Sequence, residues 1–141
     1  MKSIKLTNNL SLHEYIPREL YTKYEGREHI LIGLLDKRLV EADQLLRKRF
    51  GAVTINDWWW GGTRNWSGLR TPDSSYFSPT SQHSFGRASD KLFKNVTAEE
   101  VIEDIKINHL TYGITGLEEM VNWVHTDVRW SISGLLITFK K

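Results

Sequence analysis

The sequence predicts an α+β fold. Two segments carry apolar residues at helical spacing, three others have short β-branched or alternating runs, and no internal repeat is present. With 141 residues, 40% of them apolar and 26% charged, the chain has the length and composition of one globular domain. We therefore expect residues 1–141 to form a single domain in which helices flank a small antiparallel sheet.

The first third of the chain contains one long predicted helix. Residues 1–26 mix polar and apolar side chains, which indicates an irregular arm with a short helix near 12–15. Over residues 27–50, apolar side chains recur every three or four positions, as is typical of an amphipathic helix. Gly51 should end this helix, and the β-branched run in residues 52–56 predicts a short strand.

A long loop separates these elements from the rest. It is rich in Gly, Ser, Thr and Pro, it continues through Ser81, and loops of this length inside compact domains are usually functional. The sequence Thr-Ala-Glu-Glu at 97–100 is a capping box that predicts a helix over 98–108. Alternation over residues 121–130 and an apolar run at 135–139 predict two further strands.

The alternation in 121–130 divides this predicted strand into two faces. One face carries Val124, Thr126, Val128 and Trp130, and the other carries Trp123, His125, Asp127 and Arg129. Because the second face holds a histidine and a carboxylate, we expect it to be the one that carries chemistry.

Composition excludes several classes of protein. The net charge is only +2 and the charges are interspersed, so no nucleic-acid partner is indicated. No segment reaches about 18 apolar residues, so we expect no integral membrane contact. The amino terminus lacks a run typical of a signal peptide, so we expect the protein to be cytoplasmic as synthesised. We also expect it to be a monomer. The absence of cysteine excludes disulfides and thiolate zinc sites, and any metal must be bound by His, Asp or Glu.

Tryptophan is the residue type that departs most from the average. Six are present, and three are consecutive at Trp58–Trp60. Tryptophans at this density either fill a core or form a surface that stacks on a ligand, and packing is the commoner use.

Two histidines and one carboxylate form a candidate metal site. His83, Asp90 and His125 can supply a set that leaves one position of a tetrahedral zinc ion open for water, as catalytic zinc sites do. Gly86 would let the backbone turn sharply between the first two ligands, and Ala88 would keep bulk out of that turn.

The order of residues around these ligands resembles a family signature. Residues 81–90 read S-x-H-x-x-G-x-A-x-D, and residues 123–125 read Trp-Val-His. This is similar to the zinc-ligand signature of the D-Ala-D-Ala carboxypeptidase and L-Ala-D-Glu endopeptidase family, whose wider group includes lysostaphin-type enzymes and the hedgehog signalling domain. The resemblance implies that His83, Asp90 and His125 bind Zn²⁺, and that the fold is that of these peptidases.

The same resemblance suggests residues that bind substrate. Gly62-Thr63-Arg64 stands where the family has Ser-Gly-Tyr-Arg, whose arginine holds a substrate carboxylate. An arginine suits this role because its planar guanidinium matches a carboxylate, although Arg64 could also be a solvated loop charge. Ser81 could donate a hydrogen bond to a ligand or to substrate, or it could bond to its own backbone.

The general base is ambiguous in the sequence. Many relatives carry a carboxylate three residues before the last histidine, where this chain has Asn122. Other relatives have a glutamate six residues before it, and Glu119 matches that spacing. Asp127 competes, because on a strand it shares the face of His125 and could reach the zinc-bound water or support a ligand. We favour Glu119 over Asp127.

By this resemblance the protein is a zinc peptidase that hydrolyses peptidoglycan stem peptides, of the kind found in phage or prophage endolysins and tail-associated enzymes. Release by a phage, or a place in a virion, would bring it to the cell wall. A hydrolytically inactive zinc module that recognises wall peptides or a protein partner is the alternative. A non-haem iron oxygenase is less favoured: residues 125–127 give the motif His-x-Asp, but no histidine follows.

Overall fold

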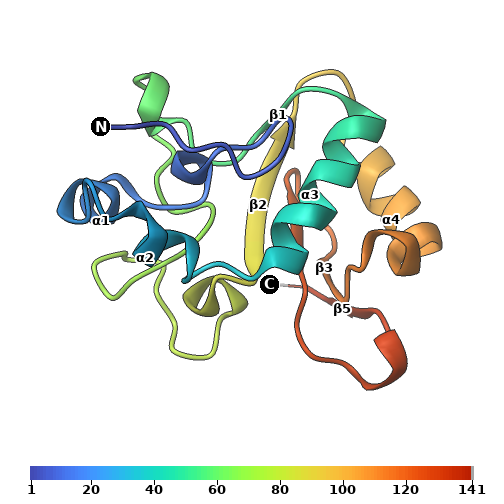
Figure 1. Cartoon of the computed structure of the whole chain (residues 1–141). Coiled ribbons are helices and arrows are strands. Elements are labelled where there is room, and N and C mark those ends of the chain that lie inside the picture. Colours follow the sequence, from blue (N-terminus) through green and yellow to red (C-terminus); the bar gives the residue numbers. More distant parts are fainter. Residues whose placement is uncertain (141) are drawn as a thin grey trace.

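In the computed structural model, which describes residues 1–140, a five-stranded sheet runs through the middle of the molecule (Figure 1). The strands are β1 (Val53–Thr54), β2 (Ala88–Phe93), β3 (Gly116–Glu118), β4 (Val124–Asp127) and β5 (Ile137–Phe139). Their order across the sheet is β1-β2-β4-β3-β5. The predicted α+β class with a small sheet is confirmed.

The sheet is mixed rather than antiparallel throughout, which corrects the prediction. The pairs β1–β2, β2–β4 and β3–β4 are antiparallel, whereas β3 and β5 are parallel. After β4 the chain crosses past β3 and forms β5, which pairs with the edge of β3 that faces away from β4. Because β4 runs antiparallel to β3, a strand that returns in the reverse direction must run parallel to β3.

The helix expected over residues 27–50 is divided into α2 (Glu28–Ile32) and α3 (Lys37–Phe50). Between them Asp36 is the N-cap of α3, where its side chain accepts a hydrogen bond from a backbone N–H of the first turn. A capping aspartate favours a new helix start over continuation of the preceding helix. Apolar periodicity continues across the break, so periodicity alone could not reveal it.

The amino-terminal arm is more ordered than its composition indicates. It contains a 3₁₀ turn at Leu12–Glu14 and the helix α1 (Arg18–Lys23). Figure 1 shows the arm with α1 and α2 on one side of β2, and α3 and α4 on the other. Several of its side chains are fully buried: Leu10, Leu12, Tyr15, Ile16 and Tyr21. Burial of these groups supplies the stabilisation that fixes the arm.

The three consecutive tryptophans have different environments. Trp58 is buried in a cluster with Ile16, and its indole N–H donates to the Ile16 carbonyl at 2.9 Å. Trp59 stacks on His13 with ring centroids 4.5 Å apart, while Trp60 is 65% exposed. Packing therefore accounts for Trp58 and for part of Trp59.

Helix α4 (Ala98–Tyr112) starts at the predicted capping box, and its backbone leaves helical geometry at Asn108, the predicted end, before a last turn that reaches Tyr112. Thr97 accepts a hydrogen bond from the Glu100 N–H, and Gly113 ends the helix with a φ of 75°. A core cluster joins α3 and α4 to one face of the sheet through Ala42, Leu46, Val101, Ile105, Leu117 and Val124. The opposite face of β2, β3 and β4 is therefore the one available for a site.

A buried lysine ties the helix-covered side of the sheet together. Lys91 is fully buried, and its Nζ lies 3.1 Å from the Asp43 carboxylate of α3. The same ammonium donates to the hydroxyls of Ser89 on β2 and Thr126 on β4, at 2.8 and 2.7 Å. These bonds satisfy the three donors of the ammonium, as a charge buried in a core requires.

The observed strands are shorter than the predicted ones. The segment 121–130 forms a strand only over residues 124–127, and the predicted strands at 52–56 and 135–139 shorten to two and three residues. Strand β3 was not predicted, because three residues carry too little alternation to be noticed. Within residues 1–140, no helix has both the length and the apolar character needed to cross a membrane.

Candidate metal centre

The structure brings together the three residues proposed as metal ligands. The register of β2 and β4 places Asp90 directly opposite His125. A 3₁₀ turn at Gln82–Phe85, just before β2, carries His83. One ligand atom from each of these three side chains lies within 4.8 Å of the other two, so the group could hold a metal ion.

The separation of Asp90 and His83 suits a four-coordinate ion, and that of Asp90 and His125 is shorter. Asp90 Oδ1 lies 2.9 Å from His125 Nδ1 and 3.3 Å from His83 Nε2. Neighbouring ligand atoms of a tetrahedral zinc ion with bonds of about 2.0–2.1 Å are about 3.3 Å apart. Three protein ligands would leave one of four positions open.

The outer nitrogen of each histidine has a hydrogen-bond acceptor. His83 Nδ1 donates to the Gly68 carbonyl at 2.8 Å, and His125 Nε2 donates to the Asp127 carboxylate at 3.0 Å. The remaining ring nitrogens are those nearest Asp90. Metal-binding histidines commonly donate their other N–H to a carbonyl or carboxylate in this way, which fixes the tautomer and the ring orientation.

Asp127 is held in place from several sides. Arg129 donates to it through Nε at 2.7 Å and through a terminal nitrogen at 2.6 Å. Burial acts to raise the Asp127 pKa, but the hydrogen bonds from Arg129 and His125 outweigh it and lower the pKa to about 2. A Cβ added to Gly116, its partner on β3, would lie 1.9 Å from Asp127 Oδ1. Asp127 is thus an ionised support behind His125.

The three candidate ligands have shifted protonation equilibria. Burial acts to raise the Asp90 pKa, but hydrogen bonds from His125 and His83 keep it well below its usual range. Burial lowers the His83 pKa. Burial also acts to lower the His125 pKa, yet the hydrogen bonds to Asp127 and Asp90 raise it overall. An ionised Asp90 and a neutral His83 are the forms that bind metals.

Gly86 and Ser81 shape the turn that carries His83. Gly86 has a φ of 67°, and a Cβ at this position would lie 1.9 Å from the Leu34 carbonyl oxygen. Only glycine meets both demands without strain. The Ser81 hydroxyl accepts a hydrogen bond from the His83 N–H at 3.3 Å and caps the turn. Ser81 therefore bonds to the local backbone, which was one of its two expected roles.

A polar cleft of about 740 Å³ lies beside the cluster, and Asp90 is part of its wall. Two arginines, three aromatic residues and several hydroxyl groups share the lining: Arg64, Arg70, Trp66, Tyr76, Trp123, Ser75, Ser78 and Ser81. The cleft is therefore suited to a ligand with negative charge and hydrogen-bonding groups.

Arg64 lies in this cleft but is held by backbone carbonyls. Its Nε donates to the Ile55 carbonyl at 2.8 Å, and a terminal nitrogen lies 3.5 Å from the Asp90 carbonyl oxygen. Part of its guanidinium is therefore engaged within the protein.

Arg70 was not singled out from the sequence. It donates to the Asp90 carboxylate at 3.0 Å and to the Trp66 carbonyl at 2.8 Å, and it also lines the cleft. Burial lowers the Arg70 pKa, although the negative charges of Asp90 and Glu118 oppose the shift. The signal that could have found it is the order Ser-Gly-Leu-Arg at 67–70, which matches Ser-Gly-Tyr-Arg better than the segment ending at Arg64.

The structure does not bring Glu119 to the cluster. Its carboxylate lies 2.9 Å from the Nζ of Lys106 on α4, which packs on the opposite face of the sheet. The preceding residue, Glu118, is buried on the side of the cluster. Without a predicted β3, the sequence provided no means of deciding which of the two glutamates faces the ligands.

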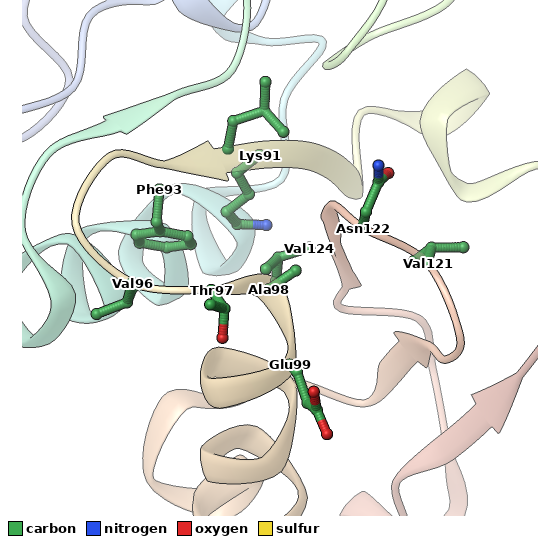
Figure 2. A pocket seen from close by; sticks show the side chains of 10 residues that line it. Lys91, Phe93, Val96, Thr97, Ala98, Glu99, Val121, Asn122 and Val124 are labelled. Carbon is green, nitrogen blue, oxygen red and sulfur yellow. The ribbon is translucent and has the colours of Figure 1, made fainter.

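A second hollow of about 460 Å³ adjoins the cleft (Figure 2). It lies between β2 and the start of α4, with Phe93 and Val96 on one wall and Val121 and Asn122 on the other. Leu92 and Asn122 line both spaces, so the cleft and the hollow are neighbours. The lining of the hollow combines apolar side chains with the polar groups of Thr97, Glu99 and Asn122.

The chain matches no protein-family profile, no curated protein and no solved structure. Its resemblance to zinc peptidases therefore remains a prediction from the signature residues, and the candidate site is described by its own geometry.

Proposed function

We propose that this protein is a zinc-dependent peptidase that hydrolyses peptidoglycan stem peptides. The observation that carries the proposal is the group of His83, Asp90 and His125, which offers three ligand atoms to an ion and shares Asp90 with a polar cleft. Structural zinc sites are normally closed by four protein ligands, whereas catalytic sites keep one position for water or substrate.

The donor set fits zinc. Two imidazole nitrogens and one carboxylate oxygen are ordinary zinc ligands, and the outer hydrogen bonds from His83 and His125 fix both rings. When bound, zinc would supply Lewis acidity that lowers the pKa of a coordinated water and polarises a carbonyl. The protein would supply orientation and charge.

Arginines in the cleft support a substrate that carries a carboxylate. Arg70 places a guanidinium within 3.0 Å of Asp90, and Arg64 lies on the same wall. A guanidinium binds a carboxylate through two parallel hydrogen bonds, so it would orient an acidic peptide beside the cluster. Stem peptides carry free carboxylates. The aromatic rings of Trp66 and Trp123 would pack against the remainder of the bound peptide.

Digestion of purified sacculi tests this function. Zinc-loaded protein should release peptides that mass spectrometry identifies as cleaved stem peptides, and a chelator should abolish the release. His125→Ala is the matched control, because it removes one ligand but leaves the cleft residues in place. Release that persists with chelator, or with His125→Ala, would argue against a zinc peptidase.

A hydrolytically inactive zinc module is the second candidate, and the positions of the predicted bases favour it. Asn122 lines the cleft where many relatives have a carboxylate, and an amide does not accept a proton usefully. Glu119 is paired with Lys106, and Asp127 is engaged by His125 and Arg129. This module would bind zinc and a stem peptide with measurable affinity but leave the peptide intact after prolonged incubation.

A further inference from the structure

We propose that Glu118 is the general base of the candidate site, in place of the two carboxylates that the sequence indicated. This inference rests on the proposed peptidase function and assigns one catalytic role within it. It follows from the face of the sheet on which Glu118 lies, its position relative to His125, and the bonds made by the other carboxylates.

The face of Glu118 follows from its neighbour. Leu117 is fully buried in the core cluster between the sheet and the helices α3 and α4, together with Val124. Successive side chains of a strand point to opposite faces. Glu118 follows Leu117 on β3, and His125 follows Val124 on β4. Both therefore project from the face of the sheet that does not meet these helices.

The strand register brings Glu118 next to the cluster. On β3 and β4, Gly116 pairs with Asp127 and Leu117 pairs with Thr126. Continuing this antiparallel register by one residue places Glu118 opposite His125, which in turn pairs with Asp90 on β2. Side chains directly opposite each other have Cβ atoms about 4.5–5.5 Å apart. The three side chains thus form a row across β2, β4 and β3.

The surroundings of Glu118 suit a proton acceptor. The residue is only 6% exposed, and no hydrogen bond or ion pair engages its carboxylate among residues 1–140. Its charge acts on the Arg70 guanidinium, which lies against Asp90 in the cleft wall. A buried carboxylate on the same face of the sheet as His125 is placed to bind a water molecule and take its proton.

The reaction balances with one proton shuttled by Glu118. Water attacks the carbonyl carbon of the scissile amide and forms a new C–O bond, while one of its protons passes to the Glu118 carboxylate. The C–N bond then breaks, and the same proton passes from Glu118 to the leaving nitrogen. The products are a carboxylic acid and an amine, and Glu118 ends as the carboxylate with which it began.

A comparison of Glu118→Gln with Glu119→Gln tests the assignment. The two neighbouring residues receive the same isosteric change, but only one faces the cluster. We expect Glu118→Gln to lower turnover of a defined stem peptide by about 10²–10⁴-fold, the usual contribution of a general base. Its zinc affinity, measured by chelator competition, and its affinity for the uncleaved peptide, measured by calorimetry, should stay within about threefold of wild type. Glu119→Gln should match wild type in all three measurements.

Chemical rescue separates a proton-transfer role from a merely structural one. Glu118→Ala should regain part of its turnover when formate is added, because a small carboxylate can enter the vacated space. Full turnover in Glu118→Gln would overturn the assignment, and so would loss of zinc from that variant or an absence of rescue. A zinc-loaded wild type that cleaves no stem peptide would overturn the peptidase function together with this inference, whereas an active wild type with an active Glu118→Gln variant overturns the inference alone.

Discussion

The carboxylate of Asp127 accepts a hydrogen bond from His125 Nε2, with 3.0 Å between the two heavy atoms. This contact leaves His125 Nδ1 directed at Asp90, 2.9 Å away. Asp127 is in turn fixed by Arg129, so two side chains in series orient one candidate ligand from behind. The arrangement gives each residue a distinct expected effect on metal binding.

Removal of a ligand should release the metal. We expect wild type to bind about one zinc ion per chain, and His83→Ala, Asp90→Ala and His125→Ala each to lose it, because two remaining ligands hold zinc weakly. Metal analysis after zinc loading and desalting measures this. His29→Ala, which changes an exposed histidine of α2, is the control and should keep its metal. A folded wild type without metal would contradict the site.

Removal of the support behind His125 should weaken metal binding without abolishing it. Asp127→Asn keeps the shape of the side chain but replaces a charged acceptor, so we expect zinc affinity to fall by about 10–100-fold. Competition with a chelating dye measures the change. Asp73→Asn alters an exposed loop carboxylate and should have no effect. Wild-type affinity in the Asp127 variant would show that the hydrogen bond to His125 is dispensable.

The two arginines of the cleft should contribute to substrate capture. Loss of one charged hydrogen bond costs about 1.5–3 kcal/mol, so Arg64→Ala and Arg70→Ala should each weaken peptide binding more than zinc binding. We expect losses of similar size, because each guanidinium has two nitrogens engaged within the protein: those of Arg64 face backbone carbonyls, and those of Arg70 face the Trp66 carbonyl and Asp90. Calorimetry with an uncleaved stem peptide measures both losses. Unchanged peptide affinity in either variant would return that arginine to a structural role.

Gly86 should be required for the turn that carries His83. Gly86→Ala would place a Cβ 1.9 Å from the Leu34 carbonyl oxygen in a backbone with positive φ. We therefore expect the free energy of unfolding to fall by more than about 1–3 kcal/mol. Gly26→Ala is the control, since it has a φ of 82° but nothing within 4 Å of the added carbon. Urea denaturation should show a larger loss for Gly86. Equal losses would mean that the steric contact with Leu34 is relieved at little cost.

Part of the site could be predicted from the sequence. The resemblance of residues 81–90 to a family signature singled out His83 and Asp90, and alternation after Asn122 placed His125 and Asp127 on one face. In the structure these four residues form a connected group: His83 and His125 each contact Asp90, and His125 also contacts Asp127. Short-range patterns of this kind depend on local backbone geometry, which the sequence specifies directly.

The proposed general base could not be predicted in the same way. Glu118 and Glu119 are adjacent, and a shift of one residue in a strand moves a side chain to the other face of the sheet. Strand β3 has three residues and is defined by its pairing with β4 and β5, which are distant along the chain. The division of the long helix at Asp36 was missed for a related reason, because capping competes with an apolar repeat that continues across the break.

The buried ammonium of Lys91 has a consequence for how the candidate site would bind an ion. Its hydrogen bonds to Ser89 and Thr126 connect β2 and β4 from the side of the core, one residue away from Asp90 and His125. Two of the three candidate ligands, Asp90 and His125, are therefore held in position by the core without an ion. An ion that binds there would have to order little of the backbone. Less of the free energy of metal coordination would then be offset by lost conformational entropy, and the affinity would be higher.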